Sequence, residues 1–183
     1  KKGHDMYREY KVLSKLNNSF AKAPKTYIYN DDLSILDRPF YLMEKIDGIV
    51  LTANEVSNRK ITAVEFEQIS KEWLNTFVEL HSIDFKSVGL GDLGKPIGYV
   101  DRQIETWSKQ YKAAMTSEIE SAHKVIKWLN ENKPASKQIS LIHNDYKYDN
   151  VVYRNEKWNE INSILDWEMC TIGDPLMDLG TSI

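Results

Sequence analysis

The stretch that decides the fold lies in residues 141–180, and its centre is the run HNDYKYDN from His143 to Asn150. A second run, ILDWE from Ile164 to Glu168, follows after a short interval. The first run has the spacing His-x-Asp-x-x-x-x-Asn, and the second places another aspartate behind an apolar segment. Mg²⁺ is typically held in proteins by one or two carboxylate or amide oxygens. The two runs therefore offer two candidate metal ligands, Asn150 and Asp166.

Three short apolar segments around these runs predict β-strands: Ile139–Ile142, Val151–Tyr153 and Ile161–Leu165. The polar segment between the last two predicts the turn of a hairpin. In such a hairpin Asn150 opens one strand and Asp166 closes the other. We therefore expect the two side chains to lie side by side and to share one metal ion.

An aspartate and an asparagine with this spacing are typical of phosphoryl-transfer enzymes. There the aspartate, here Asp145, accepts the proton of the attacking hydroxyl. Taken singly, His143 would more often be a core histidine and Asp145 a turn-forming residue. Their occurrence together with Asn150, Asp166 and Asp174 favours the catalytic interpretation.

Composition indicates a folded, globular domain and excludes several classes of protein. Hydrophobic residues make up 42% and charged residues 28% of the 183 residues, which are ordinary globular values. A net charge of -3 gives no basic footprint for nucleic acid, and no apolar run is long enough to cross a membrane. The single cysteine, Cys170, fits a reducing cytoplasm, and acidic neighbours such as Glu168 and Asp174 would raise the pKa of its thiol. We interpret Cys170 as a bystander packed near the site.

The order of predicted elements separates a small strand-containing part from a mainly helical part. Apolar spacing predicts a helix over Gly3–Leu16, and strands are expected at Thr26–Tyr29 and Pro39–Ile46. A capping box at Thr62–Glu65 opens a helix that runs to about His81, and Ser82–Gly98 is expected to be an ordered loop. Two further helices carry apolar faces at Ile104, Trp107, Tyr111 and Ala114, and at Ile119, Ala122, Ile126 and Leu129. We therefore expect an α+β, bilobal fold with residues 1–47 in the first part and 48–183 in the second.

The chain resembles the aminoglycoside-phosphotransferase-like (protein-kinase-like) small-molecule kinases over nearly its whole length. Among these it most resembles the subgroup found alone or fused to acyl-CoA dehydrogenases. The motifs that carry the resemblance are Phe40–Glu44, Val88–Asp92, Arg102-Gln103, Trp107–Tyr111, Leu165–Glu168 and Gly173–Leu179. The resemblance implies a protein-kinase-like bilobal fold with a truncated small lobe, a mainly helical large lobe and a short catalytic β-hairpin.

The resemblance also implies a role for each residue of the catalytic runs. Asp145 resembles the catalytic base and His143 the residue that braces the loop. Lys147 stands where many protein kinases also carry a lysine, and it would either reach the γ-phosphate or be a solvated lysine. Asn150 and Asp166 resemble the Mg²⁺ ligands.

For the nucleotide, ATP or GTP, the resemblance points to the first part of the chain. Met43–Ile46 resembles the hinge on which adenine rests, where backbone groups of Glu44 and Ile46 would bond it. Glu9 resembles the helix glutamate that pairs with the phosphate-binding lysine, although any amphipathic helix also carries solvated glutamates.

Three features depart from the family pattern. No glycine-rich loop and no phosphate-binding lysine precede Gly3, and members of the family continue beyond Ile183 into helices that help form the acceptor pocket. Trp167-Glu168 replaces the Phe-Gly of protein kinases, which argues for a fixed site. A polypeptide that begins at Lys1 would hold the triphosphate from one side only, so we expect it to show little activity.

The sequence thus predicts an ATP- and Mg²⁺-dependent kinase that acts on a hydroxyl of a small molecule, either a hydroxyacyl thioester or an aminoglycoside-like alcohol. A metal hydrolase using His143, Asp145 and Asp166 is disfavoured because hydrolytic zinc or iron sites are rich in histidine. A catalytically weak or inactive nucleotide-binding protein is the third alternative. Asp174 and Asp178 are expected to be structural, and Trp73, Trp107 and Trp128 to pack in the core. The acceptor, the choice of nucleotide and the oligomeric state are left open.

Overall fold

The N-terminal elements are a helix and a two-stranded hairpin that pack on each other. The computed structural model describes residues 5–135 and 138–182. Helix α1 (Met6–Leu16) starts after Asp5, whose side chain accepts a hydrogen bond from the Arg8 amide. Strands β1 (Thr26–Asn30) and β2 (Phe40–Met43) pair antiparallel. These elements confirm the predicted helix and strands, although the expected helix start at Gly3 lies outside the described residues.

Four helices form the middle of the chain, and three of them were predicted. Helix α3 (Ala63–His81) opens with the expected capping box, in which the side chains of Thr62 and Glu65 bond each other's backbone amides. Helices α4 (Tyr99–Ala114) and α5 (Glu120–Asn132) follow the loop at 82–98. The short helix α2 (Ala53–Arg59) was not predicted, because all of its residues are at least partly exposed and it has no apolar stripe.

The predicted catalytic strands form, but they belong to two small sheets. Strands β5 (Val151–Tyr153) and β6 (Ile161–Ile164) make the expected hairpin, and β3 (Ile49–Val50) pairs with β5 on its other edge. Strand β4 (Ser140–Ile142) pairs instead with β7 (Thr171–Gly173), which precedes helix α6 (Leu176–Ser182). The catalytic run thus starts from one sheet and ends in the other through a 3₁₀ turn at Tyr148–Asn150.

One hydrophobic core joins the N-terminal elements to the catalytic strands. It includes Leu13 from α1, Ile69 from α3, Leu141 from β4 and Ile164 from β6, with Trp167 fully buried among them. Residues 1–47 and 48–183 therefore share one core. Their assignment to two lobes stays a prediction. At that point Gly48 has φ +153°, and a Cβ atom there would overlap the Tyr153 carbonyl oxygen, so the close approach requires glycine.

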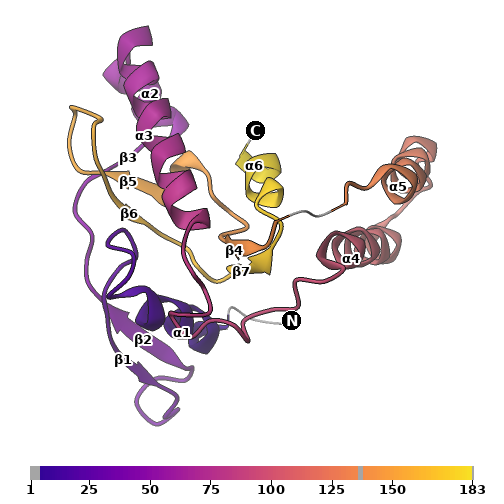
Figure 1. Ribbon diagram of the computed structural model, residues 1–183, viewed down its shortest axis with the longest axis horizontal. Coiled ribbons are helices and arrows are strands. Elements are labelled where there is room, and N and C mark those ends of the chain that lie inside the picture. Colours follow the sequence, from indigo (N-terminus) through magenta and orange to yellow (C-terminus); the bar gives the residue numbers. More distant parts are fainter. Residues whose placement is uncertain (1–4, 136–137, 183) are drawn as a thin grey trace.

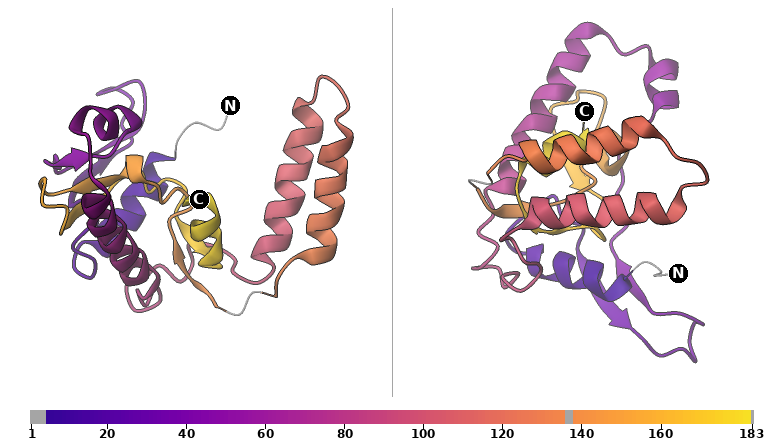
Figure 2. Two further views of the ribbon diagram at one scale, coloured as in Figure 1. Left: turned by 90° about the horizontal axis from the view of Figure 1, so that it is seen from above. Right: turned by 90° about the vertical axis from the view of Figure 1, so that its right-hand side faces the viewer.

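Helices α4 and α5 lie side by side and set away from the other elements, with α6 between them and α3 (Figures 1 and 2). Trp107 on α4 and Trp128 on α5 are 59% and 60% exposed. The expectation that these two side chains pack in the core is therefore wrong, whereas Trp73 is buried as predicted. Within the described residues, no helix has both the length and the apolar character needed to cross a bilayer.

Candidate active site

Asp145 lies in the loop that follows β4, and two of the other predicted site residues contact it directly. Its Oδ2 atom accepts hydrogen bonds from Asn150 Nδ2 at 2.7 Å and from Lys147 Nζ at 2.9 Å. Asn150 Nδ2 also donates to the Asp145 carbonyl oxygen at 2.9 Å. The Asp145 side chain keeps 27% of its surface exposed, so a substrate can reach it.

Lys147 forms an ion pair with Asp145. The hydrogen bond to Asp145 raises the pKa of the ammonium group, and the charges of Asp145, Asp149 and Asp166 act in the same direction. Lys147 is therefore a cation at the base, with 45% of its side chain exposed. Its contact with a phosphate stays a prediction.

Asp166 lies beside Asn150 because the β5–β6 hairpin brings their backbones together. The Leu165 amide donates to the Asn150 carbonyl oxygen at 2.8 Å, directly before Asp166. Asp166 has φ +67°, the left-handed region that aspartate and asparagine tolerate better than most residues. The chain turns sharply there, and the expected pair of Asn150 and Asp166 is at one end of the hairpin.

The donor set at this end suits Mg²⁺ better than zinc. Asn150 directs its amide nitrogen to Asp145, which leaves the carbonyl oxygen as the ligand atom, and Asp166 adds a carboxylate. Two hard oxygens are what Mg²⁺ takes from a protein when phosphates and water complete its shell. Among the described residues no group of three or more His, Cys, Asp or Glu side chains could hold a metal.

Glu9 on α1 reaches the segment directly after Asp166. Its Oε1 atom accepts a hydrogen bond from the Trp167 amide at 3.1 Å. Burial raises the pKa of Glu9, the hydrogen bonds from Tyr41 and Trp167 oppose this, and the charges of Asp166 and Glu168 add to it. Tyr41 was not singled out from the sequence, because nothing local to it indicates a contact with α1.

The predicted hinge, Met43–Ile46, begins at the end of β2, and part of its backbone is hydrogen-bonded within the protein. The Glu44 amide donates to the Lys25 carbonyl at 2.8 Å, and Glu44 Oε1 accepts from the Lys25 amide at 2.7 Å. In the part of the chain that the structure describes, the Glu44 carbonyl and the Ile46 amide make no backbone hydrogen bond. These are the two groups that could bond an adenine ring, and that role stays a prediction.

His143 is fully buried, and its ring packs edge-on against Trp167 with the ring centroids 4.9 Å apart. Burial lowers its pKa from 6.5 to about 4, although the charges of Asp178 and Asp145 and the Leu165 backbone favour the protonated ring. At neutral pH His143 is therefore an uncharged residue of the core. Such a residue can brace the loop but cannot supply a positive charge to the reaction.

The lowered pKa of His143 predicts that acid destabilises the fold. The unfolded chain binds a proton near pH 6.5, whereas the folded chain resists it until about pH 4. This part of the stability is complete above pH 6.5 and lost as the pH falls towards 4, to a total of roughly 3 kcal/mol. We expect urea titrations from pH 7.5 to 4.5 to show this loss and a His143→Leu variant to show a shallower slope. Parallel curves for the two proteins would contradict the prediction.

Asp178, on α6, holds the start of the catalytic loop. It is fully buried, and its carboxylate accepts hydrogen bonds from the backbone amides of His143 at 2.7 Å and Asn144 at 2.5 Å. Asp174 is also buried and accepts from the Leu176 amide at 2.9 Å at the start of α6. The structural roles expected for Asp174 and Asp178 are confirmed.

Cys170 is fully buried, as expected for a bystander. Burial raises the pKa of its thiol, and the negative charge of Asp178 adds to the effect while Arg8 opposes it. The acidic residue that raises the pKa of this thiol is thus Asp178. The expectation that Glu168 and Asp174 do so is wrong.

Asn144 is a further site residue that the sequence did not indicate. It has φ +65°, and its side chain accepts from the Tyr99 hydroxyl at 3.0 Å and donates to the Met169 carbonyl at 3.0 Å. Asparagine is one of the few residues that adopts this conformation readily, and the residue that follows it is Asp145. The two anchors therefore help to fix the direction in which the base projects.

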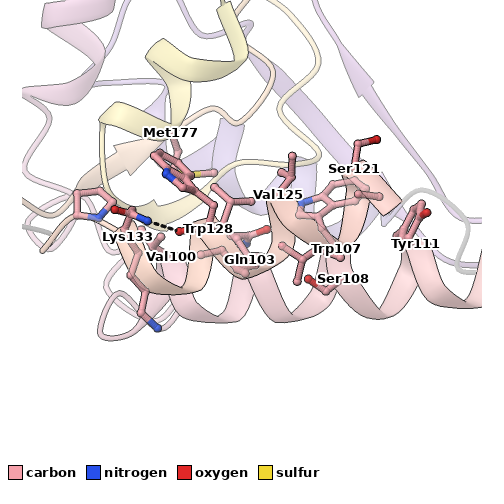
Figure 3. Close-up of a pocket in the computed structure, with 16 residues that line it drawn as sticks. Val100, Gln103, Trp107, Ser108, Tyr111, Ser121, Val125, Trp128, Lys133 and Met177 are labelled. Atoms are coloured by element: carbon pink, nitrogen blue, oxygen red, sulfur yellow. Dashed lines mark hydrogen bonds between the residues drawn. The ribbon is translucent and has the colours of Figure 1, made fainter. Parts of the chain in front are cut away.

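Two adjoining cavities open beside this loop. One, of about 330 Å³, is lined by Asn144, Glu168 and residues of α1, α4 and α6. The other, of about 720 Å³, lies between α4 and α5, and its wall is mainly apolar (Figure 3). Gln103, Trp107 and Met177 line both, so the cavity beside Asn144 adjoins the apolar groove.

Comparisons with known proteins found similar sequences and similar solved structures. The sequence profile of the phosphotransferase enzyme family matches residues 2–183. Mouse (Mus musculus) acyl-CoA dehydrogenase family member 10 is 34% identical over 184 residues, which cover 98% of this chain and 16% of the mouse protein. Human (Homo sapiens) acyl-CoA dehydrogenase family member 11 is 34% identical over 179 residues, covering 97% of this chain and 23% of that protein. The chain thus spans about a fifth of the length of these relatives.

A similar solved structure is a crystal structure of a candidate aminoglycoside phosphotransferase from Ralstonia eutropha. It has a TM-score of 0.88 and 33% identity, and the match covers 99% of this chain and 55% of that one. The ternary complex of streptomycin, ATP and APH(2")-IIa has a TM-score of 0.64 and 23% identity, over 94% of this chain and 57% of that one. These likenesses confirm the predicted α+β, kinase-like fold.

Proposed function

This chain belongs to the phosphotransferase enzyme family, and on that premise we propose that it moves the γ-phosphoryl group of ATP to a hydroxyl group of a small molecule. The observation that carries the proposal is the hydrogen-bonded group of Asp145, Lys147 and Asn150, with Asp166 at the same end of the hairpin. In phosphoryl transfer the protein mainly positions groups and stabilises charge, and these residues suit both tasks.

Each residue of this group has one task. Asp145 would accept the proton of the acceptor hydroxyl, and its hydrogen bonds from Asn150 and Lys147 hold the carboxylate in one orientation. Lys147 would offset negative charge on the transferred group. Asn150 and Asp166 would hold Mg²⁺, which when bound neutralises charge on the phosphate oxygens.

The nucleotide would rest against the hinge, with the Glu44 carbonyl and the Ile46 amide as its backbone partners and Met43 beside them. Glu9 would keep the segment after Asp166 in place through the Trp167 amide. The presence of ATP in the APH(2")-IIa complex supports ATP as the donor. GTP would be the competing donor.

For the acceptor, the apolar groove favours a molecule with an apolar chain. The groove between α4 and α5 joins the space beside Asn144, and its apolar wall includes Ile104, Trp107, Val125, Trp128 and Leu129. A polycationic aminoglycoside finds few partners on such a wall. We therefore propose a hydroxyacyl thioester or a related metabolite, in line with the acyl-CoA dehydrogenase names of the relatives. A small molecule, rather than nucleic acid or a membrane, would be the partner, and the cytoplasm the compartment.

The second candidate function is a nucleotide-binding protein with little or no catalysis. Intact Asp145, Asn150 and Asp166 argue against it, since a non-catalytic relative need not keep the base and both metal ligands.

The direct test uses the complete protein that contains this chain, radiolabelled ATP and Mg²⁺. Hydroxyacyl thioesters, the corresponding free hydroxy acids and aminoglycosides are offered in parallel. We expect one labelled product per ADP formed, with the thioester or hydroxy acid preferred. ATP that binds without transfer to any acceptor would favour the second candidate, and label on an aminoglycoside alone would overturn the proposed acceptor class.

A further inference from the structure

His81, the last residue of α3, lies outside the proposed active site but shares a buried carboxylate with it. Its Nε2 atom is 2.8 Å from Asp178 Oδ2. The same carboxylate accepts the backbone amides of His143 and Asn144. Because an ionised carboxylate can only accept hydrogen bonds, Nε2 carries the hydrogen in this contact. One aspartate thus connects the end of α3 to the two residues that precede Asp145.

The Asp178 carboxylate depends on these three donors. It is fully buried, and the His81 side chain that meets it is only 10% exposed. Within residues 5–135 and 138–182, His81 is the one side chain that donates to it. A buried carboxylate that loses a hydrogen-bond donor is destabilised, because its desolvation free energy is no longer offset. It is expected to rotate towards another donor or towards solvent. Either movement would pull on the amides of His143 and Asn144.

The His81 ring has little freedom to compensate. Phe77, one helical turn earlier, packs edge-on against it with the ring centroids 4.2 Å apart and an interplanar angle of 88°. Phe77 also contacts Tyr146, which lies inside the catalytic run, at 5.6 Å. Helix α3 therefore presents His81 to Asp178 in one orientation, and the loop is packed against the same helix.

Asn144 is the residue most sensitive to a loss of this support. Its left-handed backbone, φ +65°, is a conformation that the surroundings must hold, and its amide is bonded to Asp178. Asp145 follows it directly. A small rotation at Asn144 therefore changes the direction of the base without moving the hinge or the β5–β6 hairpin that carries Asp166.

We propose that His81 is a positioning residue for phosphoryl transfer, acting through Asp178 on the backbone of His143 and Asn144 and so on the direction of Asp145. The proposal rests on the proposed function, because it concerns the same base. His81 lines neither of the two cavities beside the catalytic loop. Its loss should therefore reduce kcat and leave both KM values nearly unchanged.

The test compares His81→Leu, which removes the donor at similar volume, with His81→Gln, whose amide nitrogen can reach the place of Nε2. In the complete protein we expect Leu to lower kcat about 10–100-fold with KM values within about threefold, and Gln to recover most of the loss. His123→Leu makes the same change on α5, away from the loop, and should leave kcat unchanged. An unaltered kcat in a folded His81→Leu protein overturns the proposal. So does a loss that Gln does not recover and that raises KM in proportion.

A second measurement separates this proposal from the proposed function. Amide hydrogen exchange of His143 and Asn144 should become at least about tenfold faster in His81→Leu and stay close to wild type in His81→Gln. If the wild type transfers no phosphoryl group but exchange responds as expected, the proposed function fails and the positioning contact stands. If exchange at both amides is unaffected by His81→Leu, His81 does not hold the loop, whatever the activity.

Discussion

Replacing Asp145 with asparagine is expected to lower kcat about 10²–10⁴-fold, the usual loss when a general base is removed. Asparagine keeps the size of the side chain and can still accept the hydrogen bonds of Asn150 and Lys147 through its oxygen. It cannot take the proton of the acceptor hydroxyl. Because Asp145 acts on the acceptor, the dissociation constant for ATP should stay within a few fold of wild type.

The matched control is Asp149→Asn, four residues along the same loop. Asp149 is exposed, and the substitution makes the same change of charge and shape. We expect it to retain nearly full activity. Turnover is measured as labelled acceptor and affinity by titration of a fluorescent ATP analogue. An Asp145→Asn protein that loses affinity and turnover equally would assign this carboxylate to the nucleotide rather than to the acceptor.

Replacing Asp166 should produce the opposite pattern, a loss of Mg²⁺-dependent nucleotide binding. Removing even a group that supports a metal ligand typically costs about 10–100-fold in affinity, so removing the carboxylate itself should cost at least that. The measurement is a titration of Mg²⁺ against bound ATP in wild type, Asp166→Ala and Asp166→Asn. An unchanged metal requirement in both variants would show that Asp166 is not a ligand.

Two Asp166 variants are needed because of the backbone at this position. At φ +67° alanine is strained by about 1–2 kcal/mol, whereas asparagine tolerates this conformation. Asp166→Asn therefore removes the charge without disturbing the turn, and Asp149→Ala controls for the loss of an acidic residue from the neighbouring loop. If only the alanine variant loses binding, the negative charge at 166 is not required, because an amide oxygen there can still ligate the ion as at Asn150.

The sequence predicted the long helices and the catalytic run well, because both carry local signals. The apolar period of α3 and the capping box at Thr62 report on the helix itself. The spacing from His143 to Asn150 is also a local signal, because all of these residues belong to one loop and lie close together in space. The adjacency of Asn150 and Asp166 followed from the length of one hairpin.

The features that sequence reasoning missed depend on contacts between distant segments. Strands β3 and β7 have two and three residues, too few for an alternating pattern, and their partners are far away in the chain. The contact of His81 with Asp178 joins residues 97 positions apart. Trp107 and Trp128 were misplaced because apolar spacing identifies the apolar face of a helix but not whether another element covers it.

The separation of α4 and α5 from the core has a consequence for how the molecule opens. Every residue of α5 is at least partly exposed, and α4 buries Tyr99, which is not part of the main cluster. Local unfolding of this helical pair therefore costs far less free energy than unfolding of the core, so the acceptor side can loosen while α1, α3 and the catalytic strands stay folded. A protease should cut first in the 115–119 connection, and it should leave the segment from β4 to β6 uncut. The wall of the acceptor groove can thus adapt to molecules of different length, while the base beside it stays fixed to the core.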